Sequence, residues 1–223
     1  IYSHLFADSP HILGNHFFPD FNEWFIFLQK IIKKTDYEWY IKPHPQQDKT
    51  TKKAIEIFIK NVPNVTLLPK NISNLYLAKK IDFALTVFGT VASELPIFGV
   101  KVINASKNNP YFNYNFCINP KNILDYEQTL LNLNKNKFQI KLKDLYEYHY
   151  MKQNYFVEEN SYIFSKMQNY IKIDKESGRE VRWTSLCYRL WLSKFSKEEH
   201  IRIKKIFEKF VESGSYMMMR NGK

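Results

Sequence analysis

Short β-rich runs alternate with amphipathic helical segments over the first two-thirds of this chain, and this alternation constrains the fold more than any other feature. The β-rich runs lie at residues 1–5, 37–41, 65–68, 83–87 and 101–104. Helical patterns lie at residues 21–33, 51–62 and 73–80, and a fourth begins at Thr90. Strands that alternate with helices are typical of parallel sheets covered on both faces. We therefore expect an α/β fold with a Rossmann-like parallel sheet flanked by helices.

The sequence changes character at about Leu142, where a helix-rich stretch dense in tyrosine and phenylalanine begins. We expect two parts, a Rossmann-like domain over residues 1–141 and a helical C-terminal segment over residues 142–223. Within the second part, Ser196 opens a capping box and Gly214 stands where a helix C-cap belongs, which predicts a last helix.

Composition narrows the class of protein. With 223 residues, of which 44% are hydrophobic, the chain is long enough for one substantial core. Cys117 and Cys187 are far apart in sequence and suggest neither a disulfide framework nor a zinc site. No apolar run approaches the roughly 18 residues that span a bilayer, so we expect a cytoplasmic protein, soluble or peripheral to the membrane. The first residue is Ile1 rather than Met, from which we expect that an upstream domain is missing.

The charge balance favours an anionic partner. The 33 Lys and Arg residues against 22 Asp and Glu residues give a formal net charge of +11. Nucleotide phosphate, a polyanionic glycan, an anionic lipid and nucleic acid all fit this charge. The basic residues are dispersed over predicted helix faces and no RNA-recognition or helix-turn-helix signature is evident, so we do not expect a nucleic-acid partner.

The first motif, Lys42-Pro43-His44-Pro45, directly follows a β-rich run. Prolines on either side of a histidine hold the backbone extended. The side chains of Lys42 and His44 are therefore presented at the carboxyl end of a strand, where open α/β sheets bind ligands. A cation and a hydrogen-bonding ring at that edge favour a nucleotide monophosphate or diphosphate. The alternative interpretation is a stiff turn whose histidine is only solvated.

The second motif runs from Thr86 to Glu94, at the end of a β-rich run and the start of a helix. Gly89 lets the backbone approach a ligand, and Thr90 is a suitable N-cap residue, so the helix start favours phosphate. The Glu94 carboxylate, one turn into the helix, suits a ribose diol. Alternatively, Glu94 only complements the positive end of the helix.

A third candidate lies at the opening of the chain. His4 and Asp8 stand where the first β-rich run enters a loop that contains Gly14. At that position the two side chains suit contacts with donor phosphate or an acceptor hydroxyl, which makes them the catalytic candidates. A polar surface loop accounts for the same residues equally well.

Five segments, in this order, resemble the C-terminal lobe of bacterial capsule and surface-polysaccharide glycosyltransferases with the two-lobed glycosyltransferase-B architecture. They are residues 4–10, 18–24, 39–45, 89–94 and 109–111. Enzymes of this group, including the capsular Kdo transferases and bacterial sialyltransferases, bind the donor nucleotide with a His-Pro motif and a later Ser/Thr motif. By this resemblance, those roles fall on His44 and Pro45 and on Thr90 and Ser93.

The resemblance implies a transferase that uses a nucleotide-activated sugar, CMP- or UDP-linked, in capsule or surface-polysaccharide assembly. We expect Lys42, His44 and the helix start at Thr90 to stabilise the departing phosphate without a metal ion or cofactor, because no DxD carboxylate pair is present. The expected donor-binding residues are Lys42, His44, Pro45, Thr86, Gly89, Thr90, Ser93 and Glu94.

The expected partners are a nucleotide-sugar donor and a glycan or glycolipid acceptor. We place the acceptor lobe in the missing upstream part and expect peripheral contact with the inner face of the membrane. Two alternatives stay open. One is a teichoic-acid-type transferase of glycerol or ribitol phosphate, which uses a His-Pro motif on the same fold. The other is a non-catalytic module that binds nucleic acid or an anionic surface.

Overall fold

The computed structural model describes residues 1–6 and 17–152, with isolated positions between residues 193 and 208. The chain divides into two compact units, residues 1–148 and 149–223. The first unit carries the candidate site. Asp8 lies outside the described residues, as does the predicted last helix apart from single positions.

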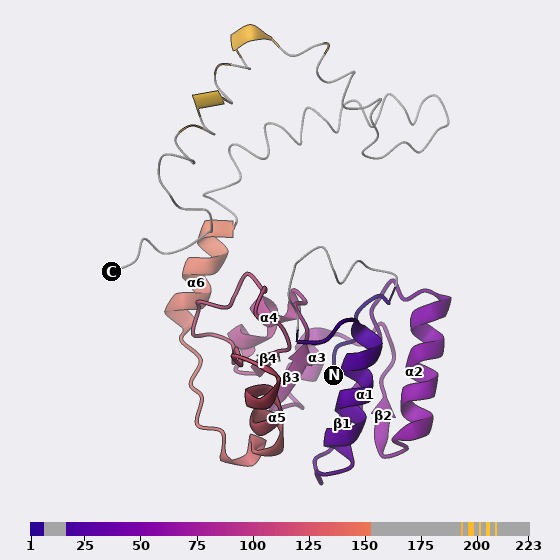
Figure 1. The fold of residues 1–223 in the computed structure, drawn as a ribbon. Helices are drawn as coiled ribbons and strands as arrows, with labels where there is room; N and C mark the ends of the chain where they lie inside the picture. The colour runs from indigo at the N-terminus through magenta and orange to yellow at the C-terminus, as the bar shows by residue number, and fades with distance from the viewer. Residues whose placement is uncertain are drawn as a thin grey trace. The chain divides into compact units, whose positions relative to one another are not determined.

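The described residues of the first unit form α-helices, two short 3₁₀ helices and four short strands, in the order seen in Figure 1. The helices are α1 (Phe21–Ile32), α2 (Lys49–Asn61), α3 (Asn74–Ala78), α4 (Val91–Glu94), η1 (Leu95–Phe98), α5 (Ile123–Leu131), η2 (Leu133–Lys135) and α6 (Leu142–Tyr150). The strands are β1 (Trp39–Ile41), β2 (Val65–Leu67), β3 (Phe83–Thr86) and β4 (Lys101–Asn104). In the part of the chain that is described, no helix has the length and apolar character needed to cross a bilayer.

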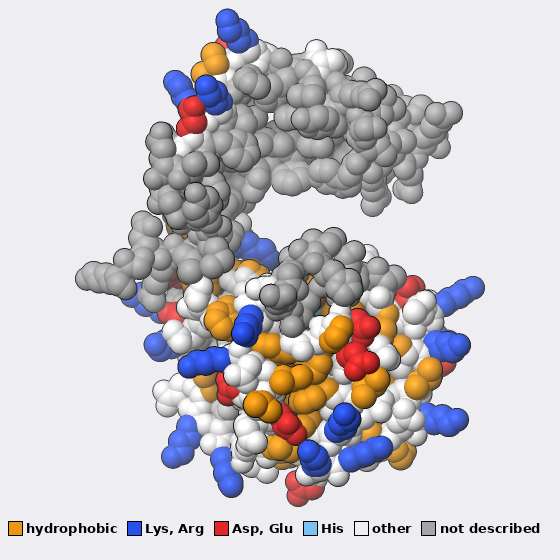
Figure 2. Space-filling view, in the orientation of Figure 1, with side chains coloured by type: hydrophobic (Ala, Val, Ile, Leu, Met, Phe, Trp, Pro, Cys, Tyr) orange, Lys and Arg blue, Asp and Glu red, His pale blue; other side chains and the backbone are white. Residues whose placement is uncertain are grey.

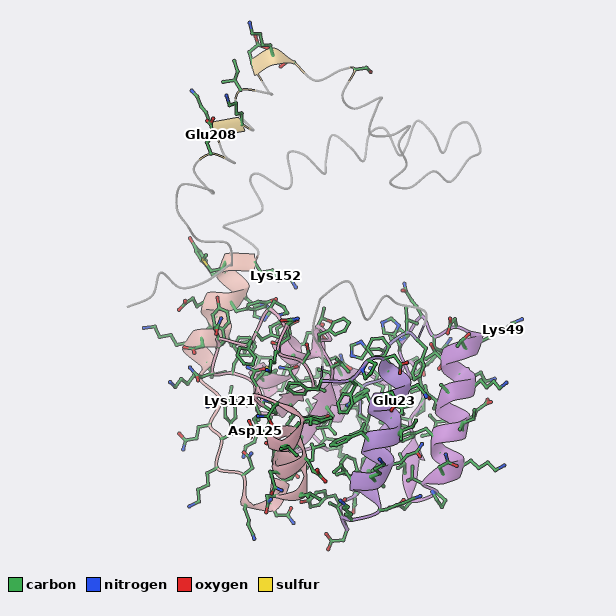
Figure 3. All side chains as sticks on the ribbon, viewed as in Figure 1. Glu23, Lys49, Lys121, Asp125, Lys152 and Glu208 are labelled. Carbon is green, nitrogen blue, oxygen red and sulfur yellow. The ribbon has the colours of Figure 1, made fainter. Side chains whose placement is uncertain are left out.

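Polar side chains fix where the longer helices begin. Asp20 accepts from the Glu23 amide at 2.8 Å to start α1, and Asp48 accepts from the Thr51 amide at 2.7 Å to start α2. At α5, the Asn122 side chain plays the same part, while the Lys121 backbone amide donates to the carboxylate of Asp125 at 2.8 Å, and the two residues lie side by side in Figure 3. Each cap satisfies an amide that the helix itself leaves without a partner.

The strands pair in parallel, β1 with β2 and β3 with β4. The first residues of the chain lie between the two pairs. The Lys42 amide donates to the Ile1 carbonyl at 2.8 Å, and the Tyr2 amide donates to the Leu85 carbonyl at 2.8 Å. The segments therefore follow one another across the structure as β2, β1, residues 1–3, β3 and β4.

Apolar side chains pack on both faces of these strands. Leu85 and Ile103 belong to one buried cluster, which also holds side chains of α1, α2 and α5. Their strand neighbours Ala84 and Val102 belong to a second cluster, with side chains of α3, η1 and α6. Because successive residues of a strand point to opposite faces, both faces are covered by helices. The chain is thus a mixed α/β protein, as the alternating pattern predicts.

Thr90 stands at the N-cap position of α4, as predicted, but its side chain does not cap the helix. Thr90 already has helical backbone angles, φ −60° and ψ −22°, and its side chain makes no capping hydrogen bond, whereas a capping residue is normally extended. The helix that follows, α4, has 4 residues before Pro96 turns it into η1, which ends at Gly99 with φ 86°. So short a helix has a small dipole, which removes the dipole argument for an anion at its start.

Candidate functional site

The carboxyl ends of the first segment and of β3 are joined through His4. The Val87 amide donates to Nε2 of His4 at 3.1 Å, so this nitrogen is the unprotonated acceptor of the ring. The Thr86 hydroxyl lies 3.0 Å from the same nitrogen and is therefore its second donor. Thr86 Oγ1 in turn accepts from the Gly89 amide at 3.0 Å. One side chain from each strand end thus closes the turn after β3.

Aromatic rings enclose the imidazole of His4. It stacks on Phe21 with 4.5 Å between ring centroids and lies 4.7 Å from the ring of Phe88. The Trp24 ring meets it edge-on at 6.2 Å. His4 is only 8% exposed. The structure therefore places this residue as a packed, hydrogen-bonded support of the strand ends rather than as a side chain open to solvent.

Gly89 is required by close approach. A Cβ atom at this position would lie 2.7 Å from Oγ1 of Thr86 and 3.7 Å from the ring of His4. The turn after β3 can pass over Thr86 only because glycine has no side chain. The sequence-based interpretation has the Gly89 backbone approach a ligand, whereas the close approach that the structure shows is to Thr86 of the protein itself.

We expect Thr86→Val to lower the free energy of unfolding by about 1–3 kcal/mol, because the half-buried Gly89 amide loses its acceptor and the buried Nε2 of His4 loses a donor. Urea denaturation followed by circular dichroism measures this. The matched control is Thr66→Val at an exposed position of β2, where the change should stay within about 0.5 kcal/mol. Equal losses in the two variants would show that the hydroxyl contributes no stability at the turn.

A chain of three polar side chains crosses the same edge of the strands. The Lys42 ammonium, just after β1, donates to Oδ1 of Asn74 at 2.6 Å, and Nδ2 of Asn74 donates to the Glu94 carboxylate at 3.1 Å. The ammonium also lies 5.5 Å from the centre of the Tyr2 ring. These contacts bring residues of the two predicted motifs to one place. Asn74, at the start of α3, links them.

Burial shifts the pKa values of Lys42 and Tyr2 in this cluster. Lys42 is 8% exposed, and burial lowers the pKa of its ammonium, while the negative charge of Glu94 partly opposes the shift. Burial, and secondarily the charge of Glu94, raises the pKa of the Tyr2 hydroxyl to about 12. That hydroxyl is buried and has no hydrogen-bond partner among the described residues. Its hydrogen-bonding capacity is therefore unused among the described residues, at a buried position beside two charged groups.

His44 lies in the turn between β1 and α2. Its backbone amide donates to Oγ of Ser3 at 3.0 Å, which ties the turn to the first segment. The Gln46 amide donates to Nδ1 of His44 at 3.1 Å, so in the neutral ring Nε2 carries the proton. The ring is half-buried and Pro45 beside it is exposed. His44 is therefore a donor held at the surface of this edge.

Ser93 lies away from the surface. It is only 2% exposed, and its hydroxyl donates to the Thr90 carbonyl at 3.1 Å. The side chain of Thr90 is exposed at the start of α4. Of these two hydroxyls, only that of Thr90 is placed where it can meet a ligand without a rearrangement.

Sequence patterns alone did not single out Tyr2, Ser3 or Asn74. A signal for Asn74 exists in retrospect: it follows the N-cap residue Ser73 at the start of the helix after β2, at the same edge as the two motifs. Tyr2 and Ser3 carry no such signal, since their roles depend on contacts with residues about forty or more positions away.

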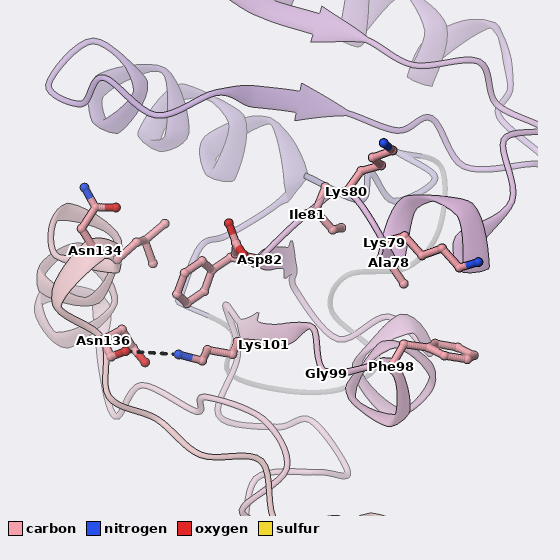
Figure 4. A pocket seen from close by; sticks show the side chains of 12 residues that line it. Ala78, Lys79, Lys80, Ile81, Asp82, Phe98, Gly99, Lys101, Asn134 and Asn136 are labelled. Carbon is pink, nitrogen blue, oxygen red and sulfur yellow. Dashed lines mark hydrogen bonds between the residues drawn. The ribbon is translucent and has the colours of Figure 1, made fainter.

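No group of three or more histidine, cysteine, aspartate or glutamate side chains in the described ranges is arranged to hold a metal ion. A hollow of about 590 Å³ lies elsewhere, beside the start of β3 and β4 (Figure 4). Lys101, at the first position of β4, lines it and donates to the Asn136 carbonyl at 3.2 Å. The two motifs stand at the carboxyl ends of β1 and β3, whereas the hollow lies at the opposite ends of β3 and β4, so it is separate from the candidate site.

Comparison of the chain with models of known protein families found no match, and neither did comparison with curated proteins or with solved structures. The candidate site is defined by its own side chains. It offers one buried cation, one carboxylate, a histidine N–H donor and an unpaired tyrosine hydroxyl within a few residues of three strand ends.

Proposed function

We propose that this chain is the donor-binding lobe of a metal-independent glycosyltransferase that uses a nucleotide-activated sugar in capsule or surface-polysaccharide assembly. One observation carries the proposal. The segments 42–45 and 86–94, singled out by motif, lie at one carboxyl edge and are tied together through His4, Ser3 and Asn74. Ligands of open α/β sheets bind at that edge.

The order of the segments supports a Rossmann-like assignment. Taken in chain order, residues 1–3 form the first segment, followed by β1, β2, β3 and β4, and across the structure they run third, second, first, fourth, fifth. This is the strand order of doubly wound nucleotide-binding folds, whose ligand crevice opens between the first and fourth strands. His4 and Thr86 stand at those two strand ends.

The chemistry expected of the site is charge stabilisation. The Nε2–H of His44 can donate to a phosphate oxygen, and the Lys42 ammonium supplies positive charge at the same edge, in place of a divalent ion. The exposed Glu94 carboxylate can accept from ribose hydroxyls. Acceptor binding is assigned to a separate lobe, and Asp8 stays a catalytic candidate outside the described residues. The glycan or glycolipid acceptor would bring the protein to the inner face of the membrane.

The nucleic-acid alternative has less support from the surface. On the face of the first unit seen in Figure 2, lysine side chains are spread mostly around the rim, with acidic side chains between them and without one continuous patch. Nucleic-acid affinity depends on many phosphate contacts along one stripe, and it falls steeply with salt. A teichoic-acid-type transferase would be recognised by a phosphodiester rather than a glycosidic linkage in its product.

We expect at least one of six nucleotides, CMP, CDP, UMP, UDP, GDP and ADP, to raise the melting temperature of the protein. A ligand at 100 times its dissociation constant adds about 2.7 kcal/mol to the free energy of unfolding, which a thermal-shift assay detects. Inorganic phosphate at the same concentration is the control for simple anion binding. No shift with any of the six would refute nucleotide binding, and an equal shift with phosphate alone would reduce the site to an anion site.

A further inference from the structure

One side-chain amide stands between the two charged groups of the site. Asn74 presents its carbonyl oxygen to the Lys42 ammonium and its NH₂ group to the Glu94 carboxylate. The carbonyl oxygen therefore faces a positive charge, and the NH₂ group faces a negative charge. A flipped amide would place NH₂ against the ammonium and the carbonyl against the carboxylate, so both contacts define a single orientation.

We infer that Asn74 is a positioning residue that fixes Lys42 and Glu94 relative to each other and thereby prepares both for a nucleotide. The inference rests on the proposed function for its effect on affinity. Its structural basis is independent of that function, because the two hydrogen bonds, 2.6 Å and 3.1 Å, join three different elements of the protein.

The fold holds Asn74 firmly in this place. It is the first residue of α3, behind the N-cap Ser73, and Leu77 anchors the helix in the second apolar cluster. The Lys42 ammonium has little water to replace a lost partner, since the residue is 8% exposed. The groups that face this ammonium are the Tyr2 ring from the first segment, Asn74 from α3 and, through its charge, Glu94 from α4.

This bridge makes the lysine and the glutamate act as a unit. Removing the amide should release both side chains from their hydrogen bonds, which affects a positive group at one end and a negative group at the other. The ammonium of Lys42 would lose an acceptor that favours its charged form, which lowers its pKa further. The carboxylate of Glu94 would lose a donor and its fixed direction. Replacing the amide by a carboxylate would instead favour the ammonium and repel Glu94.

The first test needs no nucleotide. The pKa of the Lys42 side chain is measured by NMR in the intact protein with labelled lysine, and assigned with Lys42→Arg. We expect Asn74→Ala to lower this pKa and Asn74→Asp to raise it. Asn61→Ala, which removes a surface amide on α2 bonded to Gln29, is the matched control and should leave it unchanged. An unchanged pKa in both Asn74 variants would overturn the inference.

The second test measures the affinity for CMP and UDP by calorimetry. Loss of a hydrogen bond to a charged group typically costs about tenfold in affinity, so Asn74→Ala should raise Kd about tenfold, and Asn74→Asp should also raise it by displacing Glu94. If the wild type binds nucleotide and Glu94→Gln weakens binding while Asn74→Ala does not, the inference fails and the proposed function stands. If the wild type binds no nucleotide, the proposed function fails, and the pKa of Lys42 still decides the role of Asn74.

Discussion

His44→Ala and Glu94→Gln are each expected to weaken nucleotide binding about tenfold or more, because a hydrogen bond to a charged group contributes about 1.5–3 kcal/mol. The melting temperature of the unliganded protein should hardly change. His44 is half-buried, and its hydrogen bond to Ser3 is made by its backbone amide. The Gln46 amide that loses its ring acceptor in His44→Ala is at an exposed position, and the Glu94 side chain is exposed. Calorimetric titration with CMP and UDP, together with thermal melting, measures both quantities.

Two matched variants separate a ligand site from structural residues. Gln46→Ala keeps the backbone amide that donates to His44 but changes a side chain in the same turn. Glu56→Gln removes an exposed carboxylate on α2 that lies 3.9 Å from the Lys52 ammonium. Neither should change Kd. If His44→Ala and Glu94→Gln lower the melting temperature while the affinity stays at the wild-type level, the two residues serve the turn and the helix and not a nucleotide.

Trp24→Ala is expected to lower the free energy of unfolding by about 3–5 kcal/mol, the largest stability effect that we predict. Trp24 is fully buried at 0% exposure, and its indole N–H donates to the Tyr126 hydroxyl at 3.0 Å, which joins α1 to α5. The substitution leaves a cavity and removes the donor from a buried hydroxyl. Urea denaturation followed by far-ultraviolet circular dichroism measures the loss.

Two further variants divide this effect into packing and hydrogen bonding. Tyr126→Phe keeps the ring and leaves the Trp24 N–H without its acceptor, so it should cost about 1–3 kcal/mol. Leu124→Ala, at a side chain 69% exposed on α5, should change stability by no more than about 0.5 kcal/mol. A Trp24→Ala loss as small as that of Leu124→Ala would contradict a core built around α1 and α5.

The contacts between the two motifs explain why sequence reasoning placed the candidate site only in outline. Strand–turn transitions are local properties, so Lys42 and Gly89 could be placed at strand ends from hydrophobic runs and proline or glycine positions. Which strand ends meet is a property of topology. His4 and Thr86 are 82 positions apart, and Lys42 and Asn74 are 32 positions apart.

Thr90 and Ser93 show that a sequence motif does not determine the contacts or the burial of its side chains. Both have the residue type expected at the start of a phosphate-binding helix. The Thr90 side chain, however, makes no capping hydrogen bond at α4, and the Ser93 side chain, within α4, is buried. The turn that precedes α4 is closed by Thr86, which accepts from the Gly89 amide. A threonine four residues earlier thus takes the hydrogen-bonding role that the local pattern assigned to Thr90.

The sequence by itself determined the mixed α/β class, the positions of α1, α2 and the four strands to within a few residues, and the two motifs at the ends of β1 and β3. These depend on the period of apolar side chains and on local turn chemistry, which act within one element. Only the tertiary structure decided that His4 is packed among aromatic rings and that Asn74 joins Lys42 to Glu94. Such contacts arise because parallel strands bring the ends of distant segments to one edge, and no local pattern records which ends will meet.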